Sequence, residues 1–291
     1  MRTSQLLLSS AVAAITLTAA AGAHAQTAAA ANFDWTGPYV GINLGDDFDG
    51  ATRFDRTQGT LANNNTAINL GLRPSGQATH SSGFTGGMQV GYNWQLHNNF
   101  GFSNFGMTGG WVIGAEADAQ YTDIRRTQTL SNTTLYGPLD TLGATPTTRL
   151  NQYQGDLDFL GTVRGRLGYA MGPAFLYGTG GFAYGDVERR TTFYGPNAPT
   201  TPFFTGNSNG MRTGYVYGGG IEYAVAPDSM FAWVNPFHSS GVTIKAEYLH
   251  YDLGADTLNM PGVNGGATIG SYSERVRTDG DIARAGINYK F

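Results

Sequence analysis

The sequence predicts an all-β protein, an eight-stranded antiparallel transmembrane β-barrel with long extracellular loops. Three observations lead to this prediction. Apolar residues alternate with small or polar residues in eight segments of about 10 to 15 residues, the period of a strand with two different faces. The chain of 291 residues contains 43 glycines and 12% aromatic residues, but only 13% charged residues. The charged residues inside these segments fall on the small, polar face.

In each of the first four segments, apolar residues occupy every second position, and small or polar residues occupy the positions between them. A strand with this pattern has one apolar face and one polar face. The apolar residues are Val40, Ile42 and Leu44 in 35–46; Met88, Val90 and Tyr92 in 84–95; Ile113, Ala115 and Ala117 in 111–121; and Phe159, Val163 and Leu167 in 156–170.

Three of the last four segments show the same alternation. The fifth segment, 174–188, is ambiguous because apolar residues occur at both odd and even positions. Since each segment has the length of a membrane strand, the pattern is typical of a barrel. The apolar residues are Tyr215, Tyr217 and Ile221 in 214–225; Ile244, Ala246 and Tyr248 in 242–253; and Ala283, Ala285 and Ile287 in 276–291.

The charged residues indicate which face points outward. A soluble eight-stranded barrel would have to enclose the Trp, Tyr and Phe side chains, and its interior is too narrow for them. The inverted arrangement places aromatic residues toward lipid and pairs the charges inside, among glycines that leave space. The sequence therefore predicts a lumen charge network of Glu116, Asp118, Asp158, Arg164, Arg166, Glu222, Lys245, Glu247, Arg284 and Lys290.

The lengths of the connections predict the topology. Segments 47–82 and 122–155 are long, whereas the turn at 171–173 is short. Outer-membrane barrels have long extracellular loops and short periplasmic turns, so both ends of the chain are expected in the periplasm. Segments 96–110 and 226–241 are long for periplasmic turns.

Aromatic residues fall at both ends of the predicted membrane strands, as expected for rings that prefer the headgroup region. Tyr121, Phe159, Tyr184, Tyr215 and Tyr248 would form the outer belt. All four tryptophans fall near strand ends assigned to the periplasmic side. The predicted periplasmic girdle is Trp35, Trp94, Trp111, Tyr169, Tyr223, Trp233 and Tyr289.

Arginines gather at the opposite strand ends. A guanidinium group binds phosphate through two donors, so a collar at the outer rim could bind the phosphates of lipopolysaccharide. Pairing with nearby acids, namely Asp123, Asp186, Glu188, Glu274 and Asp279, is an equally good interpretation. The predicted collar is Arg125, Arg126, Arg189, Arg190, Arg212, Arg275 and Arg277.

The N-terminal residues predict an export signal. Arg2 precedes an apolar stretch at 6–21, and Ala23-His24-Ala25 fits a signal-peptidase site. The stretch is too short and too rich in Ala, Ser and Thr for a membrane anchor. The expected organisation is a signal peptide at 1–25, a short periplasmic segment at 26–34 and an outer-membrane barrel at 35–291.

Several functions are disfavoured. The chain lacks Cys, which excludes thiolate metal sites, and its net charge of −4 argues against nucleic acid as a partner. It contains no His-Glu-x-x-His motif, phosphate-binding loop or Gly-x-Ser-x-Gly motif. His250 and Asp252 could resemble the site of a lipid hydrolase at the barrel rim. A histidine at such a rim is more typically a solvent-exposed residue without a catalytic role. We therefore predict no catalytic residue, metal or cofactor.

Several motifs resemble a known family. They are Trp35–Gly41, Gly86–Gln95, Ile113–Asp118, Gly161–Tyr169, Leu176–Gly181, Lys245–Leu249 and Ile287–Phe291, in this order and at barrel spacing. They are similar to the porin-like outer-membrane immunogenic proteins of alphaproteobacteria, which have an OmpA-like eight-stranded barrel. The resemblance implies an outer-membrane location. Phe291, with Tyr289 two residues earlier, resembles the signal read by the barrel-insertion machinery.

The predicted function is a structural one, in envelope integrity and surface contact, with a lumen closed by paired charges. A small porin-like channel for ions or small solutes is the alternative, and a rim lipid hydrolase is less favoured. The expected partners are outer-membrane lipid, lipopolysaccharide, the barrel-insertion machinery and an unidentified loop ligand.

Overall fold

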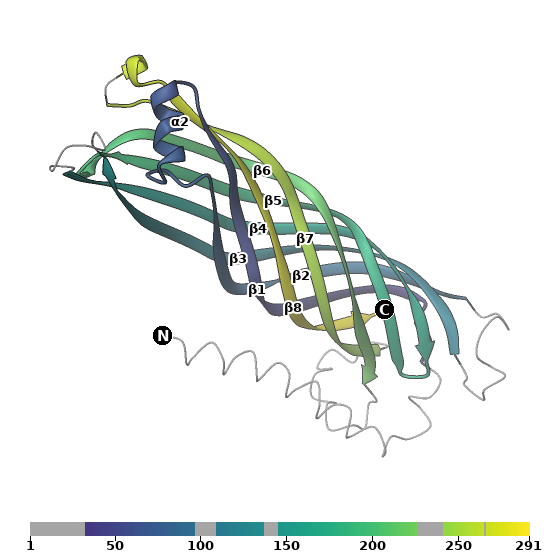
Figure 1. Cartoon of the computed structure of the whole chain (residues 1–291). Coiled ribbons are helices and arrows are strands. Elements are labelled where there is room, and N and C mark those ends of the chain that lie inside the picture. Colours follow the sequence, from purple (N-terminus) through teal and green to yellow (C-terminus); the bar gives the residue numbers. More distant parts are fainter. Residues whose placement is uncertain (1–32, 97–108, 137–144, 226–240, 265) are drawn as a thin grey trace, which may run out of the picture.

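The computed structural model describes residues 33–96, 109–136, 145–225, 241–264 and 266–291, in which eight antiparallel strands form a closed barrel (Figure 1). Each strand pairs with its neighbours in sequence, and β1 also pairs with β8. The predicted fold class is confirmed. The strands are β1 (Gly37–Gly59), β2 (Gly76–Leu96), β3 (Gly109–Tyr136), β4 (Thr145–Met171), β5 (Ala174–Gly195), β6 (Ala198–Val225), β7 (Gly241–Pro261) and β8 (Ser271–Lys290).

The described ranges also contain two short helical segments: α2 (Ala62–Asn69) between β1 and β2, and the 3-10 turn η5 (Gly266–Ile269) between β7 and β8. Among the described residues, no helix has the length and apolar character needed to cross a membrane. The predicted signal peptide lies outside the described residues.

The alternation in the sequence matches the alternation in burial. On β2, Met88 and Val90 are 69% and 54% exposed, whereas Gln89 between them is 3% exposed. The apolar face therefore points away from the lumen and the polar face lines it. This inverted arrangement is the one that a membrane barrel requires.

The strands are longer than the sequence predicts. Segments 47–82 and 122–155, expected as loops, are mostly strand, and β5 joins β6 through the two residues 196–197. The loop prediction was wrong there because the outward residues of these extensions are polar, so the apolar alternation disappears while the pairing continues. The strand 127–133, for example, reads Thr-Gln-Thr-Leu-Ser-Asn-Thr.

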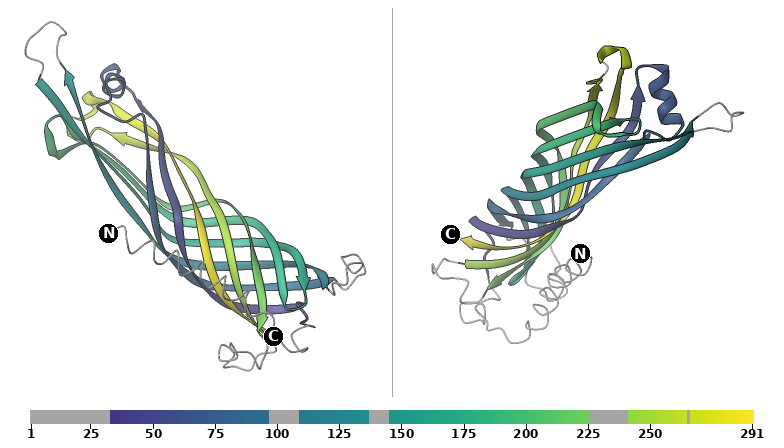
Figure 2. Two further views of the ribbon diagram at one scale, coloured as in Figure 1. Left: turned by 60° about the horizontal axis from the view of Figure 1, so that its bottom comes forward. Right: turned by 90° about the vertical axis from the view of Figure 1, so that its left-hand side faces the viewer.

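The barrel divides into two sheets at the end remote from the C-terminus. Pairing between β2 and β3 stops at Thr85 and Thr122, and pairing between β6 and β7 stops at Tyr215 and Asp252. Beyond these positions β7, β8, β1 and β2 form one sheet, and β3, β4, β5 and β6 form the other (Figure 2). We call this region the distal sandwich and the rest the closed barrel.

Aromatic side chains hold the two sheets of the distal sandwich together. Ring centroids of Phe54 on β1 and Tyr153 on β4 are 5.0 Å apart. Tyr272 on β8 lies 5.2 Å from Phe193 and 4.7 Å from Phe204 on the opposite sheet. These rings are buried, and such contacts between two sheet faces define a sandwich core.

The fifth strand, whose phase the sequence leaves open, has two apolar faces. Phe175 and Tyr177 point into the barrel and are buried, whereas Leu176 and Phe182 are 58% and 49% exposed. The inward aromatic residues explain the ambiguous pattern.

Candidate functional site

The closed barrel contains a cluster of eight buried charges, four acids and four bases. All eight belong to the predicted lumen network, and each side chain is no more than 2% exposed. We call this set the lumen cluster: Glu116 and Asp118 on β3, Arg164 and Arg166 on β4, Glu222 on β6, Lys245 and Glu247 on β7, and Arg284 on β8.

Two guanidinium groups form the centre of the lumen cluster. Arg164 contacts Glu116, and it lies 2.8 Å from Asp118 and 3.0 Å from Glu247. Arg284 lies 2.6 Å from Glu247 and 3.1 Å from Asp118. Because both arginines share the same acids, strands on opposite sides of the lumen are joined through one network.

Lys245 and Arg166 extend the network on the side of the chain termini. The ammonium of Lys245 lies 3.0 Å from Glu116 and 3.5 Å from Glu247. Arg166 contacts Glu222 at 2.5 Å and Glu116 at 3.5 Å. Each buried charge thus has a counter-charge, which offsets the high cost of removing ions from water.

Two tyrosines complete the lumen cluster, and glycines provide the space for them. Tyr39 donates to Glu116 at 2.7 Å, and Tyr177 donates to Glu247 at 3.0 Å. A Cβ at Gly91 would overlap the Tyr39 hydroxyl, and one at Gly220 would approach the Tyr177 hydroxyl to 2.7 Å. Part of the glycine content is therefore explained by lumen side chains that cross the barrel.

Two residues of the predicted network lie elsewhere. Asp158 is exposed, so its placement in the lumen was wrong. A bulge between Leu157 and Phe159 changes the phase of β4, and Asp158 pairs with Arg125 on the outer surface at 3.0 Å. Lys290 lies near the C-terminal end of β8, with its ammonium 5.7 Å from the centre of the Phe33 ring.

Apolar layers cover the lumen cluster on both sides. Toward the termini, Trp35 packs against Phe175 with ring centroids 5.2 Å apart, and its indole donates to the Gly172 carbonyl at 3.2 Å. Trp35 is 1% exposed, so its assignment to the lipid-facing girdle was wrong: the chain before β1 folds under the barrel, where Gln95 accepts its backbone N–H. On the other side lies a layer that includes Leu160, Val216, Leu249 and Ile282.

The other described girdle residues lie near the strand ends on the side of the termini. Trp94 and Trp111 are 49% and 42% exposed, and Trp111 packs edge-on against Tyr169 at 5.7 Å. Tyr223 and Tyr289 occupy outward-facing positions close to the ends of β6 and β8. Trp233 lies outside the described residues.

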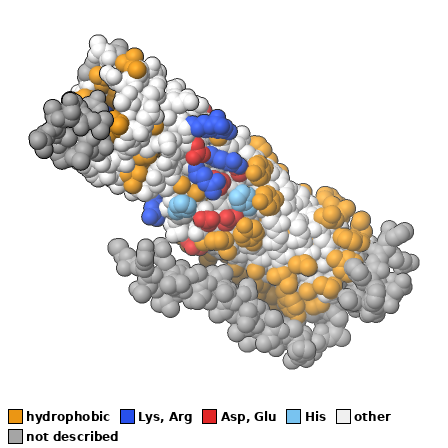
Figure 3. Space-filling view, in the orientation of Figure 1, with side chains coloured by type: hydrophobic (Ala, Val, Ile, Leu, Met, Phe, Trp, Pro, Cys, Tyr) orange, Lys and Arg blue, Asp and Glu red, His pale blue; other side chains and the backbone are white. Residues whose placement is uncertain are grey.

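A second aromatic level lies where the closed barrel meets the distal sandwich. Phe159 and Tyr184 are 5.9 Å apart, and Phe48 and Tyr248 are 6.3 Å apart. Beyond this level the surface becomes charged: Figure 3 shows acidic, basic and histidine side chains gathered beside the apolar surface. The apolar surface between the two levels is the band expected to face lipid.

Six of the seven predicted collar arginines lie beyond the outer aromatic level with some exposure to solvent. Arg125 pairs with Asp158, Arg277 pairs with Asp252, and Arg212 pairs with Asp256 at 2.6 Å. The remaining three are exposed and, among the described residues, form no ion pair: Arg126, Arg190 and Arg275.

Arg189 was wrongly placed in the collar. It is 1% exposed and points into the distal sandwich, where it donates to the Thr278 hydroxyl at 2.9 Å. The undetermined phase of the fifth strand caused this error. Arg53, which the sequence placed in a loop, lies on the outer surface of β1 and pairs with Asp279 at 3.2 Å.

His250, the candidate hydrolase residue, does not pair with Asp252. Its Nδ1 lies 2.8 Å from Asp281, which also accepts from the Tyr248 hydroxyl at 2.6 Å. A serine hydrolase would need a serine nucleophile beside this pair. The structure instead places His250 beside Asp281 and the Tyr217 ring, whose centroid is 5.0 Å away, and no group of three His, Asp or Glu among the described residues could hold a metal ion.

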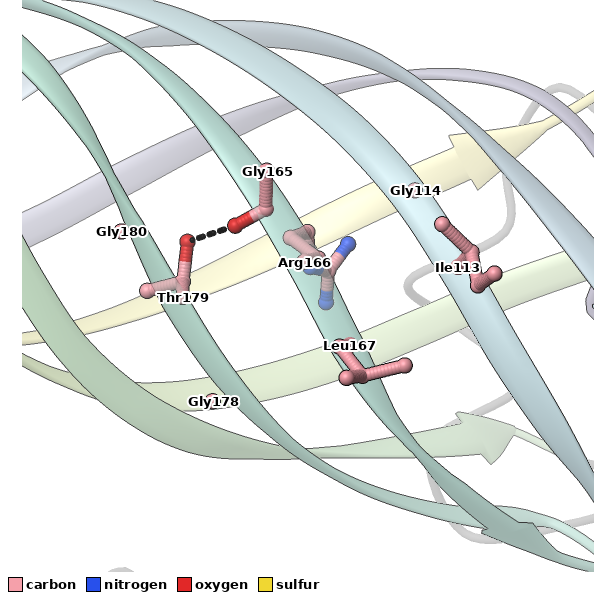
Figure 4. Close-up of a pocket in the computed structure, with 8 residues that line it drawn as sticks. All are labelled: Ile113, Gly114, Gly165, Arg166, Leu167, Gly178, Thr179 and Gly180. Carbon is pink, nitrogen blue, oxygen red and sulfur yellow. Dashed lines mark hydrogen bonds between the residues drawn. The ribbon is translucent and has the colours of Figure 1, made fainter.

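The outer surface of the closed barrel has a shallow hollow where β3, β4 and β5 meet (Figure 4). Its volume is about 440 Å³, and Ile113, Leu167, Gly165 and Gly178 contribute to its apolar lining. The exposed side chains of Ile113 and Leu167 place this hollow on the lipid side of the barrel.

The fold and this interior define a class, a membrane-spanning β-barrel with a filled lumen and an apolar outer belt. The family model for the outer membrane protein beta-barrel domain matches residues 15–291. The chain therefore belongs to this outer-membrane β-barrel family, as the motifs predicted, and it is an outer-membrane protein.

Two outer-membrane proteins are similar to this chain in sequence. The 31 kDa outer-membrane immunogenic protein of Brucella melitensis biotype 1 is 30% identical over 266 residues, 89% of this chain and 85% of that protein. The 22 kDa outer membrane protein of Rhizobium leguminosarum bv. viciae is 26% identical over 216 residues, 74% of this chain and 70% of that protein. Among solved structures, OprG from Pseudomonas aeruginosa is 11% identical with a TM-score of 0.39, over 88% of this chain and 96% of that chain.

Proposed function

We propose that this protein is a non-enzymatic surface barrel that contributes to envelope integrity and presents the distal sandwich for surface contact. The lumen cluster is the observation that supports a closed lumen. Its acids and bases are equal in number, they share contacts, and apolar layers cover them on both sides. A conducting pore would need water around such charges, and an eight-stranded barrel is just wide enough for its side chains to fill.

Single-channel recording in planar bilayers tests the closed lumen. The purified full mature chain is expected to give no steady conductance. A steady conductance of one size from the unchanged protein would instead establish the small channel and overturn the structural proposal.

The exposed arginines support lipopolysaccharide as a partner. Arg126, Arg190 and Arg275 are positioned beyond the outer aromatic level, where outer-leaflet phosphates would lie, and guanidinium groups bind phosphate through paired donors. Replacing these three with Gln is expected to reduce lipopolysaccharide co-purification. The matched control replaces Arg125 and Arg277, which already pair with Asp158 and Asp252. An equal loss in both variants, or no loss in either, would contradict this assignment.

The C-terminal end supports recognition by the barrel-insertion machinery. Phe291 is 66% exposed directly after β8, and Tyr289 occupies an outward position two residues earlier. The Phe291 ring and the outward side of Tyr289 are therefore available for contact with a partner at this end of the barrel.

A further inference from the structure

The distal sandwich has two open sides, and they differ in how their strand edges are protected. One side lies between β2 and β3, which separate after Thr85 and Thr122. The other lies between β6 and β7, which separate beyond Tyr215 and Asp252. An unpaired strand edge presents free backbone donors and acceptors to any extended chain that reaches it.

The side between β6 and β7 is protected. Arg212 and Asp256 form an ion pair across it at 2.6 Å, and Phe204 forms an isolated bridge with Gly262. Pro199 and Pro202 on β6 also remove backbone donors. Such charges and prolines are the usual means by which proteins prevent strand addition.

The side between β2 and β3 lacks these protections. Beyond Thr122, the described part of β3 pairs with β4 alone. Farther out, the contacts near this side join side chains and leave the backbone edge of β3 unpaired. Gln77 donates to the Gln128 side chain at 3.3 Å. Arg73, just before β2, donates to Leu150 and Asn151 on β4. The β3 segment 127–133, Thr-Gln-Thr-Leu-Ser-Asn-Thr, has no charge, proline or glycine, and Thr favours strands.

We propose that the free edge of β3 at 127–133 binds an extended segment of a partner protein by strand addition. Backbone hydrogen bonds would supply the affinity and alternate side chains the specificity. Arg126, at the membrane-side end of this edge, is exposed and has no ion pair among the described residues. The partner segment is therefore a short run of uncharged, strand-forming residues that ends in a carboxylate opposite Arg126.

Charge also disfavours a second copy of this chain as the occupant. Two copies in one membrane direct β3 the same way, so their edges would pair in parallel. In that arrangement Arg125 and Arg126 of both copies lie close together, and like charges across paired strands are destabilising. This inference rests on the surface-contact part of the proposed function, but binding is measured independently of conductance.

The test uses the full mature chain in lipid nanodiscs and a fluorescent synthetic peptide of alternating Val and Thr with Asp at both ends. Fluorescence anisotropy is expected to show saturable binding, and hydrogen exchange at 127–133 is expected to slow. The same peptide with Lys at both ends is expected to bind at least tenfold more weakly, because it repels Arg126.

The test variant is Thr129→Asp with Ser131→Asp, two exposed positions on β3. It is expected to lose at least tenfold in peptide affinity, because the new carboxylates repel the acidic peptide along the edge. The matched control, Asn207→Asp with Asn209→Asp on the exposed surface of β6, is expected to bind as the unchanged protein does. Heat-modifiable gel mobility confirms that both variants fold.

Four results would overturn the proposal. The first is no binding of the acidic peptide, and the second is equal loss of binding in the two variants. The third is hydrogen exchange at 127–133 that is as slow without peptide as at 160–167 of β4, since the edge would then be already paired. The fourth is cross-linking of 127–133 to the same segment of a second copy, which would establish self-association instead.

Discussion

The closed barrel and the distal sandwich both bury charged side chains, but they stabilise them differently. In the closed barrel, the eight charges of the lumen cluster contact each other. In the distal sandwich, Glu274 accepts hydrogen bonds from Thr57 at 2.9 Å and Thr191 at 3.0 Å, and it forms no ion pair within the described part of the chain. Arg73 donates to Asn151 and to backbone carbonyls, and one N–H of Arg189 has no partner among the described residues.

This difference appears in the ionisation of the groups in the distal sandwich. Burial raises the pKa of Glu274 to about 7, even though both threonine hydroxyls favour the charged form. Burial likewise lowers the pKa of Arg73 and of Arg189 to about 10. Hydrogen bonds from neutral partners thus offset only part of the free-energy cost of burying a charged group. We therefore expect the stability of the closed barrel to depend on the balance of charges in the lumen cluster, and the stability of the distal sandwich to depend on pH.

The largest effect is expected from breaking the lumen cluster. An Arg164→Met variant leaves Glu116, Asp118 and Glu247 with one base fewer, and an uncompensated buried charge costs about 3–5 kcal/mol. Urea unfolding from lipid vesicles, followed by tryptophan fluorescence, measures this loss. Three of the four tryptophans, Trp35, Trp94 and Trp111, lie at the closed-barrel end, and their signal reports the closed barrel.

The control for this prediction combines Arg164→Met with Glu116→Gln, which removes one charge of each sign. We expect the double variant to be more stable than the single one, because the cluster is again neutral. A single variant that loses less than about 1 kcal/mol would show that the lumen charges are solvated.

A smaller, pH-dependent effect is expected from Glu274→Gln. Because the folded pKa of about 7 exceeds the ordinary 4.5, the folded state retains a proton that the unfolded chain releases between these values. The stability of the distal sandwich therefore falls as pH rises from 4.5 to 7, by at most about 3 kcal/mol, and is level above pH 7. The Gln variant should lack this slope.

The chain has no cysteine, so a single Leu70→Cys substitution, at a 40% exposed position just after α2, gives a specific fluorescent label on the distal sandwich. Urea unfolding of the labelled protein at pH 5 and pH 8 measures the slope. Equal pH dependence with and without Glu274 would assign the slope to another group.

The sequence predicted the closed barrel better than the distal sandwich, for a physical reason. Between the aromatic levels, each strand faces lipid on one side and paired charges on the other. Apolar and polar residues therefore alternate strictly along the strand, and this pattern is evident in the sequence. The errors at Asp158 and Arg189 arose from a bulge and from a strand with two apolar faces. The sandwich was missed because its outward face meets water, where Thr, Ser and Asn are as typical of loops as of strands.

The smallest effect is expected from an ion pair outside both interiors. Arg53 contacts Asp279 at 3.2 Å, as close as several pairs of the lumen cluster, but its side chain is 46% exposed. Water and salt screen such a pair, so Arg53→Gln should change the free energy of unfolding by about 0–1 kcal/mol, and by less in high salt. Urea unfolding of the labelled Leu70→Cys protein at two salt concentrations measures this change. Since distance is nearly the same as in the lumen, a loss as large as that of Arg164→Met would mean that contact geometry, and not burial, determines the contribution of these charges.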